Sequence, residues 1–220
     1  MSTSTLVPPI AKADLATQPI SRKFGFDRGT PIDRYYIEKF LAVNARDIHD
    51  HVLEIGDSTY ANRFGTSVNR TDVLHADAGN RRATIIGDLV SGREIPSAAF
   101  DCIILTQTLC CIFDLSSAVA NVHRALAKGG VVLATVPGIS QISRFDMDRW
   151  GDYWRFTTLS ARRLFEQVFA SSSVQIEAHG SLAASIAFLE GRAVEECQNI
   201  DLDQTDPDYE LLITIRAQKR

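Results

Sequence analysis

The ten residues from His51 to Tyr60 constrain the fold more than any other stretch of this sequence. A short apolar run, VLEI, ends in Gly56 and is followed by the polar residues DST. Such a run is typical of a buried parallel strand that passes through a tight turn into a helix. In an open α/β sheet, ligands bind beyond the carboxyl ends of the strands. We therefore expect Glu54 and Gly56 to face a nucleotide-like cofactor.

Apolar runs and amphipathic segments alternate along the rest of the chain, which predicts a mostly parallel sheet with helices on both faces. We expect further strands at residues 71–77, 82–89, 100–106, 131–136, 174–178 and 209–216. Helices are expected at 115–127, after 158 and at 182–194. Only a short connection joins the second and third strands, which is too short for the usual crossover helix. A loop around Gly79 and Asn80 is expected to replace that helix.

Local signals predict where two helices begin and end. Thr30 is the expected N-cap of a helix with Pro31 at its first position, because a hydroxyl caps free N–H groups and proline needs no N–H there. Gly129 and Gly130 are expected to stop the helix at 115–127.

The chain has 220 residues, a length that suits a single domain. Residues 1–22 are rich in Ser, Thr, Pro and Ala without periodicity and predict a flexible leader, followed by one domain over residues 23–220.

Charge and composition argue against several function classes. The net charge is -4, and no run of Lys or Arg would follow a phosphate backbone, so we expect no nucleic-acid partner. We expect no membrane span, because no apolar run reaches about 18 residues, and no N-terminal signal is seen, so the expected location is the cytoplasm. None of the four cysteines forms a CxxC pair or stands at zinc-like spacing with histidine, so we expect no metal site.

Four motifs together resemble a class I S-adenosylmethionine-dependent methyltransferase. They are VLEIG at 52–56, GDL at 87–89, IPSAAFD at 95–101 and, most specific of all, VHRALAKGGV at 122–131. The resemblance implies a Rossmann-like three-layer α/β sandwich with a seven-stranded, mostly parallel sheet and an antiparallel last strand. It also implies S-adenosylmethionine as the cofactor. The residues WRFT at 154–157 resemble a stretch in bacterial methyltransferases of surface-sugar and natural-product pathways, which favours a small acceptor.

One departure from the family pattern lies in the opening stretch. The family usually carries Gly-x-Gly-x-Gly after the acid, whereas here Ser58 and Tyr60 replace the later glycines. Without those glycines the backbone is less free to approach the cofactor. Either the loop takes a different path, with the Ser58 or Thr59 hydroxyl substituting, or cofactor binding is impaired.

The resemblance implies a set of cofactor-binding residues. They are Arg34, Tyr35, Glu54, Gly56, Asp77, Asp88, Leu89, Thr106 and Gln107. Asp77 would accept hydrogen bonds from the ribose hydroxyls, because a carboxylate only accepts. Asp88 would bind the adenine amino group, and Arg34 would hold the cofactor carboxylate with two hydrogen bonds. The alternatives are an Asx turn at Asp77 and an ordinary helix surface at Arg34 and Tyr35.

The aperiodic segment at residues 139–158 is expected to be functional, because a loop of this length in a compact domain usually is. The resemblance implies that its part from Arg149 to Thr157 contacts the acceptor. Trp150 and Trp154 would form flat walls, Asp152 would be the catalytic base and Arg155 would hold an anion. In the alternative, the aromatic side chains pack over the end of the sheet, and Asp152 and Arg155 form a structural ion pair.

The sequence therefore predicts methyl transfer to a small-molecule acceptor by in-line displacement, with the acceptor, the methylated atom and the oligomeric state left open. A catalytically inert protein of the same fold is one alternative, because of the replaced glycines. A nicotinamide-dependent oxidoreductase is disfavoured, because Gly-x-Gly-x-x-Gly does not follow the first strand.

Overall fold

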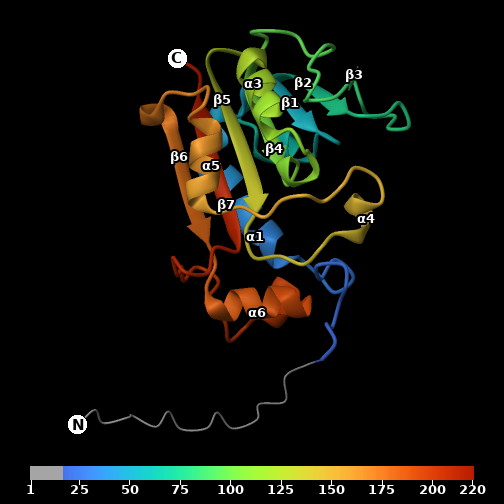
Figure 1. The fold of residues 1–220 in the computed structure, drawn as a ribbon, viewed down its shortest axis with the longest axis vertical. Coiled ribbons are helices and arrows are strands. Elements are labelled where there is room, and N and C mark those ends of the chain that lie inside the picture. The colour runs from blue at the N-terminus through green and yellow to red at the C-terminus, as the bar shows by residue number, and fades with distance from the viewer. Residues whose placement is uncertain (1–16) are drawn as a thin grey trace, which may run out of the picture.

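The computed structural model describes residues 17–220, in which seven strands form one sheet with helices on both faces (Figure 1). The strands are β1 (His49–Ile55), β2 (Ser67–His75), β3 (Ile85–Ile86), β4 (Phe100–Thr106), β5 (Leu126–Pro137), β6 (Val174–His179) and β7 (Leu212–Gln218). Their order is β3-β2-β1-β4-β5-β7-β6. The pairs on the β3 side of β5 are parallel, and β7 is antiparallel to both β5 and β6. The predicted Rossmann-like sandwich with an antiparallel last strand is confirmed.

The helices divide between the two faces of the sheet. They are α1 (Ile32–Val43), α2 (Thr59–Phe64), α3 (Leu115–Ala125), α4 (Arg144–Met147), α5 (Thr158–Phe165) and α6 (Leu182–Glu190). Neighbouring residues of β4 show the division, since side chains alternate between the faces of a strand. Ile103 packs in the core that α3 and α5 cover, whereas Ile104 packs in the core of α1, α2 and α6.

The glycine pair does not end α3 as predicted. The helix already ends at Ala125, and Leu126 is extended and pairs with Phe100 of β4. Gly129 and Gly130 lie within β5, where the N–H of Gly129 donates to the backbone oxygen of Lys219 at 2.8 Å. Strand pairing at the start of β5 therefore ends the helix before the glycines are reached.

The start of α1 is one residue later than predicted. Pro31 occupies the N-cap position and Ile32 is the first helical residue. The N–H and hydroxyl of Thr30 both donate to the carboxylate of Glu195 instead, at 2.9 and 2.8 Å. A tertiary partner thus takes the hydroxyl away from the helix end.

The β2–β3 edge is less regular than predicted. The strand β2 ends at His75, and β3 contains only Ile85 and Ile86. A loop without a helix joins them, as expected. The hydroxyl of Thr84 accepts a bond from the N–H of Val73 at 2.9 Å and so replaces part of the strand ladder. A side chain therefore shortens β3 to two residues.

Two further boundaries differ near the C-terminus. The helix α6 ends at Glu190, not Val194, because Gly191 takes a left-handed conformation with φ of 78°. The last strand begins at Leu212, not Tyr209.

The predicted leader, residues 1–22, falls mostly outside the described residues. Its described end packs against α6, because the N–H groups of Ile20 and Ser21 donate to the backbone oxygen of Glu190 at 2.7 and 3.2 Å. Among residues 17–220, no helix combines the length and the apolar character needed to cross a membrane.

Candidate active site

Two adjoining cavities lie at the carboxyl ends of β1 and β4. The first, of about 330 Å³, is called here the α1 half, because α1 supplies Asp33, Arg34 and Ile37 to its wall. The second, of about 440 Å³, is called the β3 half and lies over the ends of β2 and β3. Both are lined by Ile55, Gly56, Gln107, Cys111 and Asp146. These shared residues join the two halves into one groove.

Glu54 and Gly56 lie in this groove, as the opening stretch predicts. Glu54 is 3% exposed, and its carboxylate accepts hydrogen bonds from the N–H groups of Tyr60 and Ala61 at 3.0 and 2.8 Å. Burial raises the pKa of Glu54 to about 7, although these two bonds oppose the rise. Gly56 has φ of 86°, and a Cβ atom there would meet nothing within 4 Å. The glycine thus permits a backbone conformation that few other residues adopt and leaves the groove floor open.

The loop after Gly56 takes a path that does not use the hydroxyls of Ser58 or Thr59 at the groove. Asp57 accepts a bond from the N–H of Thr59 at 2.8 Å and starts the turn into α2. Ser58 accepts a bond from the side-chain amide of Asn62 at 3.1 Å. Asp57 and Tyr60 line the α1 half, whereas Ser58 and Thr59 are not among its lining residues. Of the two residues that replace the family's later glycines, only Tyr60 therefore lines the α1 half, together with the neighbouring carboxylate of Asp57.

Arg34 and Tyr35 are separated by the helix. The Arg34 guanidinium lines the α1 half, 5.1 Å from the centroid of the Phe26 ring and 5.8 Å from that of Tyr60. Within residues 17–220 it has no carboxylate partner. The Tyr35 hydroxyl instead donates to Asp203 at 2.7 Å, and Tyr35 does not line the groove. Only Arg34 of this pair is placed to meet a bound anion.

Asp88 and Leu89 line the β3 half together with His75. The Asp88 carboxylate accepts bonds from the N–H groups of Val90 and Ser91 at 2.8 and 3.0 Å. Burial alone would raise the pKa of Asp88, but these bonds outweigh it and hold the pKa below its usual value. A carboxylate that stays ionised at neutral pH thus lies beside the apolar side chain of Leu89.

Asp77 does not end a strand and is not among the residues that line the groove. It lies two residues beyond the end of β2, and its exposed carboxylate accepts a bond from the N–H of Gly79 at 2.7 Å. This arrangement is the Asx turn that the sequence left open as the alternative.

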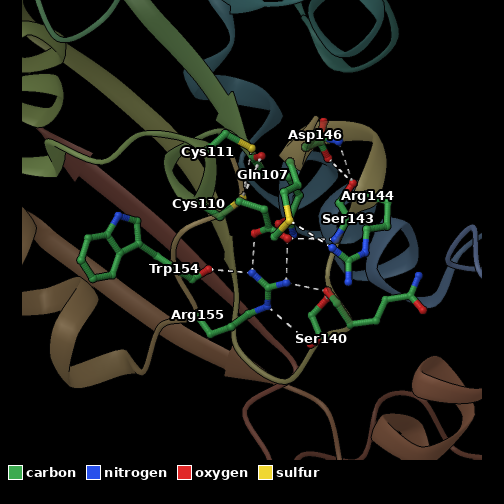
Figure 2. A network of polar contacts seen from close by, with 12 residues as sticks. Gln107, Cys110, Cys111, Ser140, Ser143, Arg144, Asp146, Trp154 and Arg155 are labelled. Atoms are coloured by element: carbon green, nitrogen blue, oxygen red, sulfur yellow. Dashed lines mark hydrogen bonds and ion pairs between the residues drawn. The ribbon is translucent and has the colours of Figure 1, made fainter. Parts of the chain in front are cut away.

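Asp152 and Arg155 line the α1 half as an ion pair. Figure 2 shows the Arg155 guanidinium within a network of polar contacts, with Trp154 on one side and Ser140 on the other. The two carboxylate oxygens of Asp152 accept bonds from Arg155 at 2.6 and 3.0 Å, and one also accepts from the N–H of Ser143 at 2.8 Å. Burial pushes the pKa of Asp152 upward, but the bonds from Arg155 and Ser143 prevail and lower it. Arg155 also donates to the backbone oxygens of Gln141 and Trp154. The geometry thus matches the structural ion pair and is poorly suited to a base or an anion site.

The two tryptophans lie in different places. Trp150 lines the β3 half, with its ring centroid 5.3 Å from that of His75 and the rings nearly perpendicular at 89°. Trp154 stacks on Phe113 at 5.6 Å, and its ring N–H donates to the backbone oxygen of Ile112 at 2.9 Å. It lines a separate shallow cavity outside the groove. The two rings therefore do not form one wall.

Thr106 ends β4 and Gln107 follows it, and both line the α1 half, as predicted. Gln107 has φ of 48°, which is strained for a residue other than glycine, and its N–H donates to the backbone oxygen of Thr135 at 2.9 Å. Cys110 and Cys111 come next, with their sulfur atoms 3.8 Å apart. The hydrogen bond with Cys111 and burial raise the pKa of Cys110, so this thiol is poorly suited to act as a nucleophile.

The sequence interpretation missed several groove residues, among them Asp33 and His75. Asp33, on the first turn of α1, is half-buried in the α1 half, and burial raises its pKa to about 6. His75, the last residue of β2, lines the β3 half. Asp33 could have been found in the sequence because it is next to Arg34, and His75 because it lies two residues before Asp77. Among residues 17–220, no three His, Cys, Asp or Glu side chains converge as metal ligands.

The fold and the groove at the strand ends define a methyltransferase of class I architecture. A family model described as a methyltransferase domain matches residues 14–175, which is most of the chain. The chain therefore belongs to this family of methyltransferases, whose cofactor is S-adenosylmethionine.

Solved structures agree on the fold. A SAM-dependent methyltransferase from Archaeoglobus fulgidus is similar, with a TM-score of 0.54 and 12% identity over 84% of this chain and 94% of that one. An S-adenosylmethionine-dependent methyltransferase from Mesorhizobium loti is similar with a TM-score of 0.54 and 14% identity, over 86% of this chain and 98% of that one. The N-methyltransferase NodS from Bradyrhizobium japonicum, solved with S-adenosylhomocysteine, is similar with a TM-score of 0.52 and 13% identity, over 90% of this chain and 93% of that one. No curated protein matches the sequence.

Proposed function

We propose that the protein transfers the methyl group of S-adenosylmethionine to a small-molecule acceptor bound in the α1 half of the groove. The observation that carries this proposal is the division of one continuous groove into two halves of different chemistry. Cavities of about 300–1,000 Å³ are typical of small-molecule sites.

The residues present fit the cofactor. Gly56 leaves open space on the groove floor, and Arg34 is a cation without a carboxylate partner among residues 17–220. We assign Arg34 to the carboxylate of the methionine end, with Glu54 and Gly56 beside that end. Asp88 and Leu89 are assigned to the adenine, because an ionised carboxylate accepts from an amino group while an apolar side chain packs on a ring. Thr106 and Gln107 lie between the two ends.

When bound, S-adenosylmethionine supplies a methyl group on a positively charged sulfur. The protein's part is then to hold the acceptor in line and to take up a proton from it. Asp152 is held by Arg155 and Ser143, so we assign proton acceptance to Asp33. Asp33 has a pKa raised to about 6, which lets it be mostly ionised near neutral pH and still hold a proton better than an exposed carboxylate.

A small acceptor is supported by the size and lining of the α1 half. Its volume is about 330 Å³, and Phe24, Phe26 and Phe188 contribute aromatic rings to its wall. Ser140 and Gln141 add polar groups. Such a mixture suits a natural product or a sugar-type molecule with one or two polar substituents.

Calorimetry with S-adenosylhomocysteine tests the proposal directly. We expect saturable binding by the full chain, followed by methyl transfer when S-adenosylmethionine and a panel of hydroxyl and amine acceptors are added. Absence of binding at millimolar ligand would sink the proposal. Binding without turnover across the panel would favour an inert protein of this fold, and tight binding of NADH alone would favour the oxidoreductase.

A further inference from the structure

A tertiary contact crosses the mouth of the β3 half. His75 ends β2, whereas Trp150 follows α4, in the segment after β5. Their ring centroids are nevertheless 5.3 Å apart, and both residues line the β3 half with Asp88 and Leu89. In Figure 1, α4 stands away from the helices that cover the sheet. The segment after α4 therefore reaches back over the end of β2.

Backbone bonds hold Trp150 in this place, while its ring stays accessible. The N–H groups of Trp150 and Gly151 both donate to the backbone oxygen of Asp146, at 2.7 and 3.0 Å. The ion pair of Asp152 with Arg155 anchors the chain two residues later. The Trp150 side chain is 38% exposed, and His75 is the aromatic ring that it contacts. A well-anchored backbone thus presents an indole ring that is not packed into the core.

The chemistry of the β3 half suits a flat heteroaromatic group. Leu74, Leu89 and Ile112 supply apolar surface, and Asp88 supplies an ionised acceptor. Nucleobases stack well on aromatic side chains, and removal of such a side chain weakens binding. An indole at the open side of such a cavity can complete the enclosure of a base.

We propose that Trp150, supported by His75, closes over the adenosine part of the cofactor and is a cofactor-binding residue, not a wall of the acceptor site. This inference rests on the proposed function, because it assumes that the β3 half receives the adenosine. It also gives the segment after β5 two tasks, since Ser143 and Asp152 of the same segment line the α1 half.

The chain has two tryptophans, which permits a matched fluorescence experiment. The Trp154→Phe variant retains Trp150 alone, and the Trp150→Phe variant retains Trp154 alone. We expect S-adenosylhomocysteine and adenosine to change the emission of Trp154→Phe strongly and that of Trp150→Phe little. Methionine, which lacks the base, is expected to leave both unchanged. An unchanged emission of Trp154→Phe at saturating S-adenosylhomocysteine would overturn the proposal.

Calorimetry provides the second measurement. We expect Trp150→Ala to weaken S-adenosylhomocysteine binding about 10-fold, as the loss of one stacked ring implies. Trp150→Phe should restore part of the affinity, and Trp154→Phe should bind as the wild type does. Equal affinity of Trp150→Ala and wild type would overturn the proposed role of Trp150 in adenosine binding and would leave the cofactor proposal intact. If the wild type itself fails to bind, the proposed function fails with it, so the two failures are distinguishable.

Discussion

The two halves of the groove are built in different ways. The α1 half is framed by regular elements, with α1 on one side and the β1–α2 turn on another, and its carboxylates are held by backbone N–H groups or by Arg155. The β3 half is framed by loops, because β3 has two residues and no helix joins β2 to β3. Regular elements place charged groups that can act on a reacting atom, whereas loops shape a surface for a flat ring.

The side chains that line only one half differ as well, although the β3 half also contains the ionised carboxylate of Asp88. Asp33, Glu54 and Asp57 line only the α1 half, whereas Leu74, Leu89 and Trp150 line only the β3 half. Substitution of Asp33 should therefore change the reaction and substitution of Glu54 the pH dependence of stability, whereas substitution of Asp88 should change cofactor affinity alone.

The largest expected effect is on proton transfer in the α1 half. Asp33→Asn keeps the shape of the side chain but removes the proton acceptor, so we expect single-turnover methyl transfer to slow about 100-fold or more. In the wild type the rate should rise with pH through about 6, since Asp33 accepts a proton only when ionised, and this rise should vanish in the variant.

The control for this experiment lies on the same helix. Glu38→Gln changes a carboxylate that pairs with Arg63 outside the groove, so it should leave the rate unchanged. Binding of S-adenosylhomocysteine should be the same in both variants. A normal rate and pH profile in Asp33→Asn would show that the acceptor needs no base here or uses another group.

The next effect belongs to the β3 half. Asp88→Ala removes a charged acceptor, which corresponds to about 1.5–3 kcal/mol, or roughly 10- to 100-fold in S-adenosylhomocysteine affinity by calorimetry. Because Asp88 also bonds the N–H groups of Val90 and Ser91, thermal unfolding should be measured in parallel. Glu94→Ala, which removes an exposed carboxylate six residues later that does not line the groove, is the matched control. Equal affinities of the two variants would place the adenine elsewhere.

A smaller effect concerns stability and pH. Glu54 has its folded pKa raised to about 7 from an ordinary value of 4.5, so the folded protein binds this proton more tightly than the unfolded chain does. Its contribution is fully present below about pH 4.5 and is lost as pH rises through 7. Glu54→Gln removes this dependence, and we expect the free energies of unfolding of the two proteins to diverge by about 2–3 kcal/mol between pH 5 and 8.

Denaturant unfolding across this pH range measures the divergence. The amide that replaces the Glu54 carboxylate in this variant keeps one of the two bonds from Tyr60 and Ala61 and loses the other, which lowers stability equally at every pH. The change with pH, not the offset, is therefore the readout. Parallel curves for the two proteins would contradict the raised pKa.

The smallest effect is expected at Asp77. Its carboxylate is engaged with Gly79 and does not line the groove, so Asp77→Ala should change S-adenosylhomocysteine affinity by about twofold at most, as is usual for surface positions. A loss of affinity comparable to that of Asp88→Ala would show that Asp77 binds the ribose and that the β3 half rearranges on binding.

Much of the fold could be predicted because it depends on local patterns. The apolar runs of β1, β4 and β5 are buried in the sheet, and the predicted strands follow one another along the chain as expected, although the short helix α4 lies in the segment predicted to be aperiodic. Helix boundaries were predicted wrongly where a residue distant in sequence provides the hydrogen-bond partner. Glu195 accepts the hydroxyl of Thr30, and Lys219, just after β7, accepts the N–H of Gly129. Long-range hydrogen bonds of this kind leave no trace in local periodicity.

In the candidate site too, local patterns predicted some positions and long-range contacts decided the others. The positions of Glu54, Gly56 and Asp88 in the groove follow from strands whose ends must meet at one edge of the sheet, and the sequence alone determined them. Only the tertiary structure decided which of two neighbours faces the groove. It turned Arg34 inward and Tyr35 toward Asp203, and it put Trp150 over the β3 half and Trp154 against Phe113. Residue type fixes what a side chain can do, but packing fixes what it meets.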